Sequence, residues 1–305
     1  GPILNHPDQG GYLEWEAYPR QKIFADLQTP FLFPDAAIFR ADQAFQDPTV
    51  LASLVAEYHP AYLLVPRELH GFPQRAAQLP EYAPVFVDDA AVLYASAASQ
   101  PEVVAEYRLS AIEPFALQVL GGDADAAARA AAELARVNAI FPDGGRMRVF
   151  EGALALERGD VAGAQRIADD VIARHPERSE GYRLRGDALV RAQRVADAAD
   201  AYAAGLARSE NPDQEFYLNG RLWACYAHLN RPAEAYRALR RALGDVYRAS
   251  VGYADLASLA DAALDAGHEA EGRTLLEFAL AKTPPSDAAT RARLDARLRG
   301  LSPIR

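Results

Sequence analysis

The feature that most constrains the fold is a spacing of 34 residues that recurs in the second half of the chain. Gly152 and Gly186 are 34 residues apart, and so are Ala164 and Ala198. The interval lengthens to 37 between Ala198 and Ala235, which places the additional residues in turns. A fixed period of this length is typical of an array of short repeats, in which each repeat buries its apolar face only against its neighbours.

Each copy combines a small residue, an alanine about twelve positions later and, in two copies, a proline about twelve beyond that. This pattern resembles the tetratricopeptide repeat, which implies an all-α solenoid of about four to five helix pairs over residues 116–305. We expect Asp123–Pro142 to be the second helix of a degenerate leading repeat. The four clearer copies are Met147–Pro176, Tyr182–Leu206, Asn219–Leu243 and Leu256–Pro284.

Glycines have two predicted roles in this array. Gly152 and Gly186 fall where the two helices of a pair come closest, so a larger side chain there is expected to overpack the contact. Gly159 and Gly267 are predicted to end a helix in left-handed geometry. A last helix is expected to begin after Asp287 and to cap the array with a polar outer side.

An array of this kind is expected to bind a protein or peptide partner in its concave face, and the alternative is that it only spaces or dimerises. Arg183 and Arg185 could contact an acidic ligand or belong to a solvated face. The residues chosen as candidates for partner binding are Arg146, Arg183, Arg185, Asp187 and Asn219.

The first 115 residues show a different pattern, in which short β-rich runs alternate with helical stretches. This alternation predicts a small, mostly parallel α/β sandwich with right-handed crossovers. The last two runs are separated only by two residues, which predicts an antiparallel hairpin at the sheet edge. Helices are expected at Gln43–Tyr58, Glu68–Leu79 and Pro101–Leu109. The expected strands are Ile3–Asn5, Lys22–Ala25, Ala61–Val65, Pro84–Asp88 and Ala91–Ala95.

Charge separates the two halves and excludes some functions. The net charge of -10 argues against a general nucleic-acid binder. Residues 1–115 hold 15 acidic against 6 basic residues, whereas residues 116–305 hold 27 against 26, so we expect two domains that meet near Glu113–Gly122. The single cysteine, Cys225, excludes an intramolecular disulfide and a thiolate metal cluster. The Gly-Pro start is typical of a protease-cleavage scar.

The first domain contains no dinucleotide fingerprint, phosphate loop or nucleophile elbow. No catalytic residue, cofactor or metal site is therefore predicted in this chain. The residues retained as candidates for ligand binding are Asp8, Gly10, Gly11 and Asp26, because Asp8 and Asp26 follow strand ends, where α/β sites usually form.

Four segments of the first domain carry a second resemblance. The runs 3–15, 18–26, 58–66 and 85–94 (ILNHPDQGGYLEW, YPRQKIFAD, YHPAYLLVP and VFVDDAAVLY) resemble, in order, the C-terminal extracytoplasmic domain of bacterial polytopic, type C membrane glycosyltransferases that use lipid-linked sugars. The sequence departs from that family after Asp26, where Leu27-Gln28 replaces the usual Gly-Arg.

This resemblance implies a non-catalytic domain on the periplasmic side of the bacterial inner membrane. The membrane helices, and the catalytic acidic residues between them, would lie upstream of Ile3, and the repeats would recruit an acceptor or another subunit. One alternative is a periplasmic scaffold without transferase activity. Another alternative is a soluble α/β enzyme with a repeat appendage.

Overall fold

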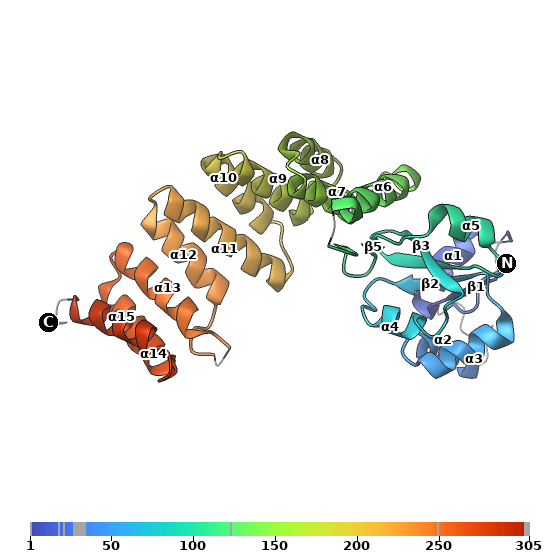
Figure 1. Cartoon of the computed structure of the whole chain (residues 1–305), viewed down its shortest axis with the longest axis horizontal. Coiled ribbons are helices and arrows are strands. Elements are labelled where there is room, and N and C mark those ends of the chain that lie inside the picture. The colour runs from blue at the N-terminus through green and yellow to red at the C-terminus, as the bar shows by residue number, and fades with distance from the viewer. Residues whose placement is uncertain are drawn as a thin grey trace. The chain divides into compact units, whose positions relative to one another are not determined.

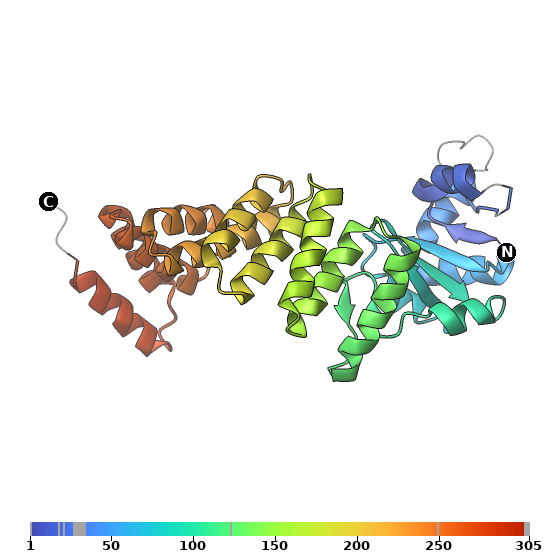
Figure 2. The same ribbon diagram turned by 90° about the horizontal axis from the view of Figure 1, so that it is seen from above.

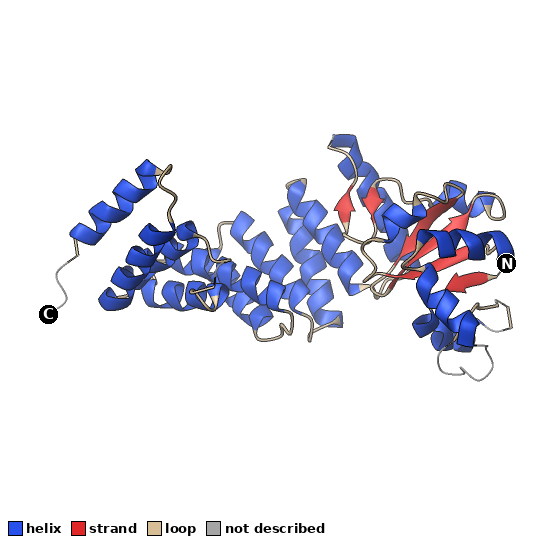
Figure 3. Ribbon diagram, turned by 90° about the horizontal axis from the view of Figure 1, so that it is seen from below, coloured by secondary structure: helices blue, strands red, loops and turns tan. Residues whose placement is uncertain are grey.

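A computed structural model describes residues 2–17, 19–20, 22–26, 35–122, 124–248 and 250–301. The chain divides into two compact units, Gly1–Leu154 and Ala155–Arg305, and each is considered by itself. Every strand in the described part of the chain belongs to the first unit (red in Figure 3), whereas the second is built from helices.

The first unit is organised around a four-stranded mixed sheet with the order β1-β2-β4-β3 (Figure 1). Leu63 and Val65 of β2 pair with Tyr94 and Val92 of β4, and all four side chains are buried. The alternation of buried and half-buried residues along β2 is the pattern of a strand with one face on the core. The strands are β1 (Ile3–Asn5), β2 (Tyr62–Pro66), β3 (Tyr82–Val87) and β4 (Ala91–Ser96).

The prediction of a mostly parallel sheet is wrong. Only β1 and β2 pair in parallel, whereas β4 runs antiparallel to both β2 and β3. The chain reverses at Asp88, whose carboxylate accepts the backbone N–H groups of Ala90 and Ala91 at 2.8 and 2.7 Å. After this turn β4 inserts between β2 and β3, so β3 does not pair with β2. Of the strand expected at Lys22–Ala25, the described residues show only a bridge between Ile3 and Ile23.

Two helices form where one was expected at Gln43–Tyr58. The break lies at Asp47-Pro48, where the Asp47 carboxylate caps the second helix by accepting from Thr49 N at 2.7 Å. Figure 1 shows α2 and α3 on one side of the sheet and α5 on the other. The helices of this part are η1 (Pro7–Gln9), α1 (Gly10–Ala17), α2 (Asp35–Ala44), α3 (Pro48–Tyr58), α4 (Phe72–Ala76) and α5 (Pro101–Tyr107).

The core of the first unit centres on Phe72, whose ring lies 5.5–6.2 Å from the rings of Phe45, Tyr94 and Phe115. Aromatic packing at these separations adds to the free energy gained by burying the rings. A short two-stranded sheet, β5 (Ile112–Glu113) with β6 (Gln118–Val119), follows α5.

The first compact unit extends past residue 115 because helix α6 (Ala124–Ile140) packs into its core. Leu134 of α6 is fully buried in that core. The neighbouring Glu133 is also buried, and its carboxylate accepts hydrogen bonds from Ser110 N and Oγ, Ala111 N and Ile112 N at 2.8–3.2 Å. Glu133 thus ties α6 to the segment that enters β5.

The second unit carries tetratricopeptide-like helical repeats. The helix pairs α9–α10, α11–α12 and α13–α14 follow one another as hairpins (Figures 1 and 2). Cys225 is free and buried between them. The helices are α7 (Gly145–Glu157), which spans the boundary between units, α8 (Val161–Arg174), α9 (Ser179–Arg191), α10 (Val195–Leu206), α11 (Pro212–His228), α12 (Pro232–Leu243), α13 (Tyr253–Asp265), α14 (Glu269–Lys282) and α15 (Ala288–Arg299).

The same backbone turn joins the two helices of every pair. A residue with φ between 54° and 84° ends each first helix, and the next N–H donates to a carbonyl five residues back at 2.8–2.9 Å. This is the Schellman motif, which satisfies the free carbonyls at a helix end. Gly159 and Gly267 are left-handed as predicted, and Gln193 and Asn230 occupy the equivalent positions.

Small residues allow the helices of a pair to approach closely. A Cβ added to Gly186 of α9 would lie 2.6 Å from Cδ1 of Tyr202 on α10, and one added to Gly272 of α14 would lie 2.6 Å from Cγ of Leu264 on α13. The predicted close approach at Gly186 is therefore confirmed. Ala164 and Ala198, which share the repeat position of Gly272, are fully buried.

Helix α15 closes the array as the capping pattern predicts. The Asp287 carboxylate accepts from Thr290 N at 3.1 Å, and Leu294 is buried against the core of the last repeat. Arg291 donates to the carbonyls of Leu280 and Thr283 at 3.1 and 2.8 Å, which satisfies the C-terminal end of α14.

Candidate functional site

A polar cluster joins the first helices of two successive pairs. Asp187 of α9 accepts hydrogen bonds from the hydroxyls of Tyr202 on α10, at 2.7 Å, and Tyr217 on α11, at 3.1 Å. Arg183 lies one turn before Asp187, with Nη1 3.4 Å from its Oδ2. Arg221 of α11 donates from Nε to the Tyr217 hydroxyl at 2.8 Å, and its guanidinium lies 4.9 Å from the Tyr217 ring centroid.

The cluster has more positive than negative charge. One carboxylate, Asp187, faces two guanidinium groups, those of Arg183 and Arg221. The Arg183 and Arg221 side chains are 29% and 47% exposed, so a ligand can reach both of them. Burial and the adjacent Asp187 carboxylate raise the pKa of Tyr202, so its hydroxyl stays protonated and continues to donate. An anionic group of a ligand would balance the surplus charge.

Of the predicted partner-binding residues, the structure brings together Arg183 and Asp187. Arg185 points to the other side of α9, because two residues along a helix differ by about 200°. Its Nη2 lies 2.8 Å from Oδ1 of Asp169 on α8, beside a groove of about 380 Å³ between α8, α9 and α10. Arg185 therefore belongs to a different surface from Arg183.

Asn219 and Arg146 do not take part in this cluster. Asn219 is buried on α11, where its Nδ2 donates to Glu215 O at 2.8 Å, so it faces the packing between helices. Arg146 is in the first unit, where its backbone N–H donates to the Asp89 carboxylate at 2.9 Å. Burial, and secondarily the charge of Arg146, lower the pKa of Arg67.

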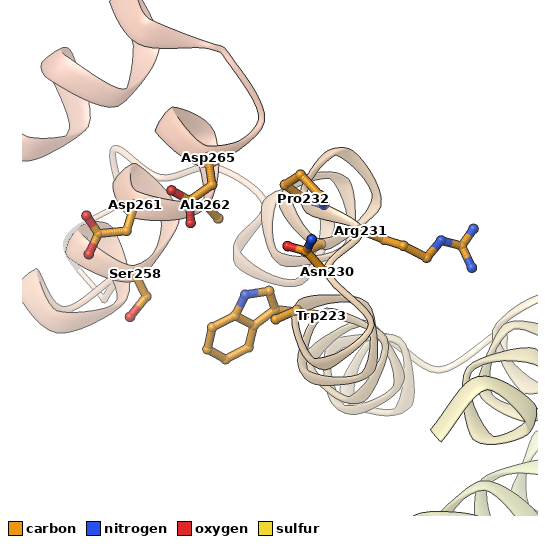
Figure 4. Close-up of a pocket in the computed structure, with 10 residues that line it drawn as sticks. Trp223, Asn230, Arg231, Pro232, Ser258, Asp261, Ala262 and Asp265 are labelled. Atoms are coloured by element: carbon orange, nitrogen blue, oxygen red, sulfur yellow. The ribbon is translucent and has the colours of Figure 1, made fainter. Parts of the chain in front are cut away.

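A second feature on the repeats is an open groove between α11 and α13, with a volume of about 620 Å³. Trp223 of α11 lies in it and faces α13 (Figure 4). Ser258, Asp261 and Asp265 line the α13 side, and Asn230 lines the turn between α11 and α12. Arg231 also lines the groove, but its guanidinium points away from Trp223 (Figure 4).

Two of the predicted ligand-binding residues in the first unit, Gly10 and Asp26, are closely packed against each other. A Cβ on Gly10 would lie 2.6 Å from Cα of Asp26, so glycine is needed there for α1 to approach the backbone. Asp26 is 1% exposed, and the adjacent Ala25 carbonyl accepts from the buried Asn5 side chain at 2.8 Å. Gly11 follows inside α1. The structure thus gives Gly10 and Asp26 a role in closing the fold.

Asp8 stands beside a histidine instead of joining Asp26. His6 lies between two carboxylates, with Nδ1 3.5 Å from Asp8 Oδ2 and Nε2 3.2 Å from Asp42 Oδ1. Its ring packs against Phe45 at 5.5 Å. Because both ring nitrogens of His6 face carboxylates of η1 and α2, this arrangement orients η1 on α2.

Within the described residues, no group of three or more His, Cys, Asp and Glu side chains gathers closely enough to hold a metal ion. None of the described helices is both long enough and apolar enough to span a bilayer.

Sequence reasoning missed Tyr217, Arg221, Trp223 and Asp265. The repeat spacing indicated part of the site. Asp187, Ala224 and Asp261 are 37 residues apart in succession, so they occupy the same position in successive first helices. Side chains of the next repeat complete each cluster. The repeat register predicts which positions of two successive repeats lie next to each other, but it does not predict the rotamers that bring their side chains into contact.

No protein-family model and no curated protein matches the sequence. Among solved structures, the chain is similar to a thermophilic TPR protein from Thermus thermophilus (19% identity, TM-score 0.38, covering 57% of this chain and 92% of that one). It is also similar to YrrB, described as a TPR protein with an unusual peptide-binding site (15%, 0.45, 56% and 87%), and to pilF of Pseudomonas aeruginosa (13%, 0.45, 59% and 86%). At these identities the likeness concerns the fold alone, and the repeat assignment depends on the helix pairs and turns described above.

Proposed function

We propose that the second unit is a protein-interaction module that binds a segment of a partner protein along its first helices, α9, α11 and α13. The observation that carries this proposal is the cluster of Arg183, Asp187, Tyr217 and Arg221. Its hydrogen bonds hold two partly exposed guanidinium groups in fixed positions, so they lose little conformational entropy when they bind an anionic group. A carboxylate of the partner is the group that this geometry favours.

The test uses the full chain and a phage-displayed library of random peptides. We expect the selected peptides to contain Asp or Glu, or to present a free C-terminus. In calorimetry, the double variant Arg183→Gln/Arg221→Gln should bind such a peptide at least about thirtyfold more weakly, since each of the two charge-assisted hydrogen bonds contributes about 1 kcal/mol or more.

Arg191→Gln is the matched control, because Arg191 is exposed near the end of the same helix α9. It should bind the peptide as the wild type does. A library that yields no peptide able to bind the chain in solution would contradict the interaction function. Peptides that bind the double variant and the wild type equally would place the site elsewhere.

We also propose, from the four ordered segments in residues 3–94, that the chain is the periplasmic part of a membrane glycosyltransferase that uses lipid-linked sugars, in which the repeats recruit the acceptor. The alternative is a periplasmic scaffold without transferase activity. Deletion of residues 155–305 from the parent tests both. This end point keeps Glu133 and its hydrogen bonds, which a deletion from residue 116 would remove.

If the repeats recruit the acceptor, the deletion should lower the transfer of radiolabelled sugar to it in membranes at least about tenfold, the effect of losing about 1.4 kcal/mol of binding free energy. The hydrolysis of the lipid-linked donor should stay unchanged. Unchanged transfer would contradict recruitment, and a parent gene that encodes no membrane helices would contradict the transferase origin.

A further inference from the structure

The groove beside Trp223 is large enough to admit a side chain of a partner protein. Besides the indole, its walls include three alanines, from α11, α12 and α13. Small wall residues leave the indole accessible, and the volume of about 620 Å³ exceeds that of any single side chain. The Trp223 side chain is partly buried and packs against the cores of two successive repeats, so its position is fixed.

The charge of this groove is negative. Asp261 and Asp265 line it from α13, and the cation in its lining, Arg231, is neutralised by Glu234 at 2.7 Å. Figure 4 shows the Arg231 guanidinium directed away from the indole. The groove therefore differs in sign from the cluster around Arg183.

The two carboxylates are not equivalent. Asp261 pairs with Arg297 of α15, at 3.2 Å, across a neighbouring groove of about 590 Å³ that is also lined by both aspartates. Asp265 forms no hydrogen bond or ion pair with any residue that the structure describes. Asp265 is exposed and thus keeps its charge available for a ligand.

The Trp223 indole and the Asp265 carboxylate line the same groove, and Asp265 has no hydrogen-bond or ion-pair partner among the described residues. This combination suits a cation carried on an aliphatic side chain. The ring face attracts a guanidinium or ammonium group, and the carboxylate neutralises it. The methylene groups of an arginine or lysine side chain can pack on the alanines of the walls. A carboxylate ligand would be repelled by Asp261 and Asp265.

We propose that this groove binds an arginine or lysine side chain of the partner protein, with its cation against Trp223 and paired with Asp265. The inference rests on the proposed interaction function, because it supplies the chemistry of one position in the bound segment. Asn230 and Ser258 also line the groove, where the Asn230 amide can bond the backbone of that segment and the Ser258 hydroxyl, which donates to Ala254 O, can accept from it.

The first test needs no partner. The chain contains only two tryptophans, so Trp223 is the single tryptophan fluorophore of a Trp15→Phe variant. Its quenching by caesium and by iodide measures the local charge. We expect Asp265→Asn to lower the ratio of the caesium to the iodide constant about two- to threefold, and Glu277→Gln, which removes an exposed carboxylate of α14, to leave it unchanged. Equal ratios in all three proteins would overturn the proposal.

The second test uses hexa-arginine amide as the probe and Trp223 emission as the readout, in the same Trp15→Phe background. We expect saturable quenching, and about fivefold weaker binding with Asp265→Asn than with Glu277→Gln. Trp223→Phe, which keeps most of the packing, should weaken binding about threefold in calorimetry. Equal binding by the Asp265→Asn and Glu277→Gln variants would show that only the overall negative charge attracts the probe, and would overturn the proposal.

The two proposals can fail separately. If library peptides bind the chain but contain no basic residue that Asp265→Asn affects, this inference is wrong and the interaction function remains. If the groove binds hexa-arginine as expected but no library peptide binds, the interaction function is wrong and the cation site remains.

Discussion

The two units of this chain are held together in different ways. In the first unit, single buried polar side chains each fasten one irregular segment: Asn5 joins β1 to the backbone of Phe24 and Ala25, and Glu133 joins α6 to residues 110–112. In the second unit, one backbone turn and one kind of small-residue contact recur in successive pairs.

This difference determines which side chains are free for binding. Where backbone turns and small residues supply much of the packing, polar side chains on the first helices can stay partly exposed, as those of Arg183 and Arg221 do. In the first unit, by contrast, the polar residues near Gly10 are already used in closing it. The candidate binding surfaces therefore lie on the repeats.

The variant Glu133→Ala tests most strongly whether a single buried side chain holds α6 in the first unit. The variant leaves the buried N–H groups of Ala111 and Ile112 without their acceptor, and hydrogen bonds to a charged group contribute about 1.5–3 kcal/mol each. We expect the first unit to lose about 3–5 kcal/mol of unfolding free energy, measured by hydrogen exchange of residues 110–112. Glu14→Ala, at an exposed position of α1, is the control and should change it by less than about 0.5 kcal/mol. Equal protection in both variants would refute the single-anchor description.

Two glycine variants test whether small residues are needed where the helices of a repeat come close. Gly186→Ala should destabilise the second unit by about 2–3 kcal/mol, because the new methyl group overlaps the Tyr202 ring. Gly220→Ala, inside α11 with no atom near the added methyl group, should stabilise it by about 0.5–1 kcal/mol through helix propensity. Urea unfolding followed by Trp223 fluorescence in a Trp15→Phe background measures both. The same sign for both variants would contradict the close-contact role.

The stability of the second unit at alkaline pH measures how much the buried Tyr202 hydroxyl of the cluster contributes to folding. The pKa of Tyr202 is raised above its usual value near 10 by burial and by Asp187. Below about pH 10 the tyrosine is protonated in both states, so its contribution to stability is complete. Above about pH 10 the unfolded chain releases the proton while the folded chain keeps it, so unfolding becomes easier by up to about 1.4 kcal/mol per pH unit.

Tyr202→Phe removes this contribution. At neutral pH the variant should lose about 1 kcal/mol with the hydrogen bond to Asp187. Between about pH 10 and 11 its stability should fall less steeply than that of the wild type in urea titrations. Parallel curves would show that the Tyr202 hydroxyl is exposed to solvent.

The smallest effect is expected at Gln193, which adopts φ +59° where two equivalent turns have glycine. Left-handed backbone costs a residue with a Cβ about 1 kcal/mol. Gln193→Gly should therefore raise the stability of the second unit by about 0.5 kcal/mol, and Gly159→Ala should lower it by about 1 kcal/mol. Thermal unfolding checks both, and a destabilised Gln193→Gly variant would mean that the glutamine side chain stabilises this turn.

The repeats were more predictable from sequence than the sheet. A period of 34 to 37 residues fixes which positions recur, and Gly159, Gly186 and Gly267 have the predicted roles. Strand positions near Ile3–Asn5 and Tyr62–Pro66 were also recognisable from β-rich runs. The antiparallel pairing of β4 with β2 was not, because it depends on where β4 inserts after its turn, and this is decided by tertiary packing.

The site was only partly predictable for a related reason. Arg183 and Asp187 lie four apart on one helix, so their proximity follows from helical periodicity. Tyr217 and Arg221 join them from α11 of the next pair, whose greater length (17 residues against 13 in α9) breaks the 34-residue period. The proximity of Trp223 to Asp265 likewise depends on how α11 and α13 stack.

The longer spacing of the later repeats has a consequence for how such a chain can change. The additional residues lie in the first turn of α11, which has 17 residues where α9 and α13 have 13, and in the segment before α13, so each hairpin keeps its own turn. A hairpin with its leading linker can therefore be treated as an exchangeable cassette. Duplicating or grafting one by recombination would lengthen the array and add a new row of surface side chains, while the turn inside each existing hairpin kept its geometry.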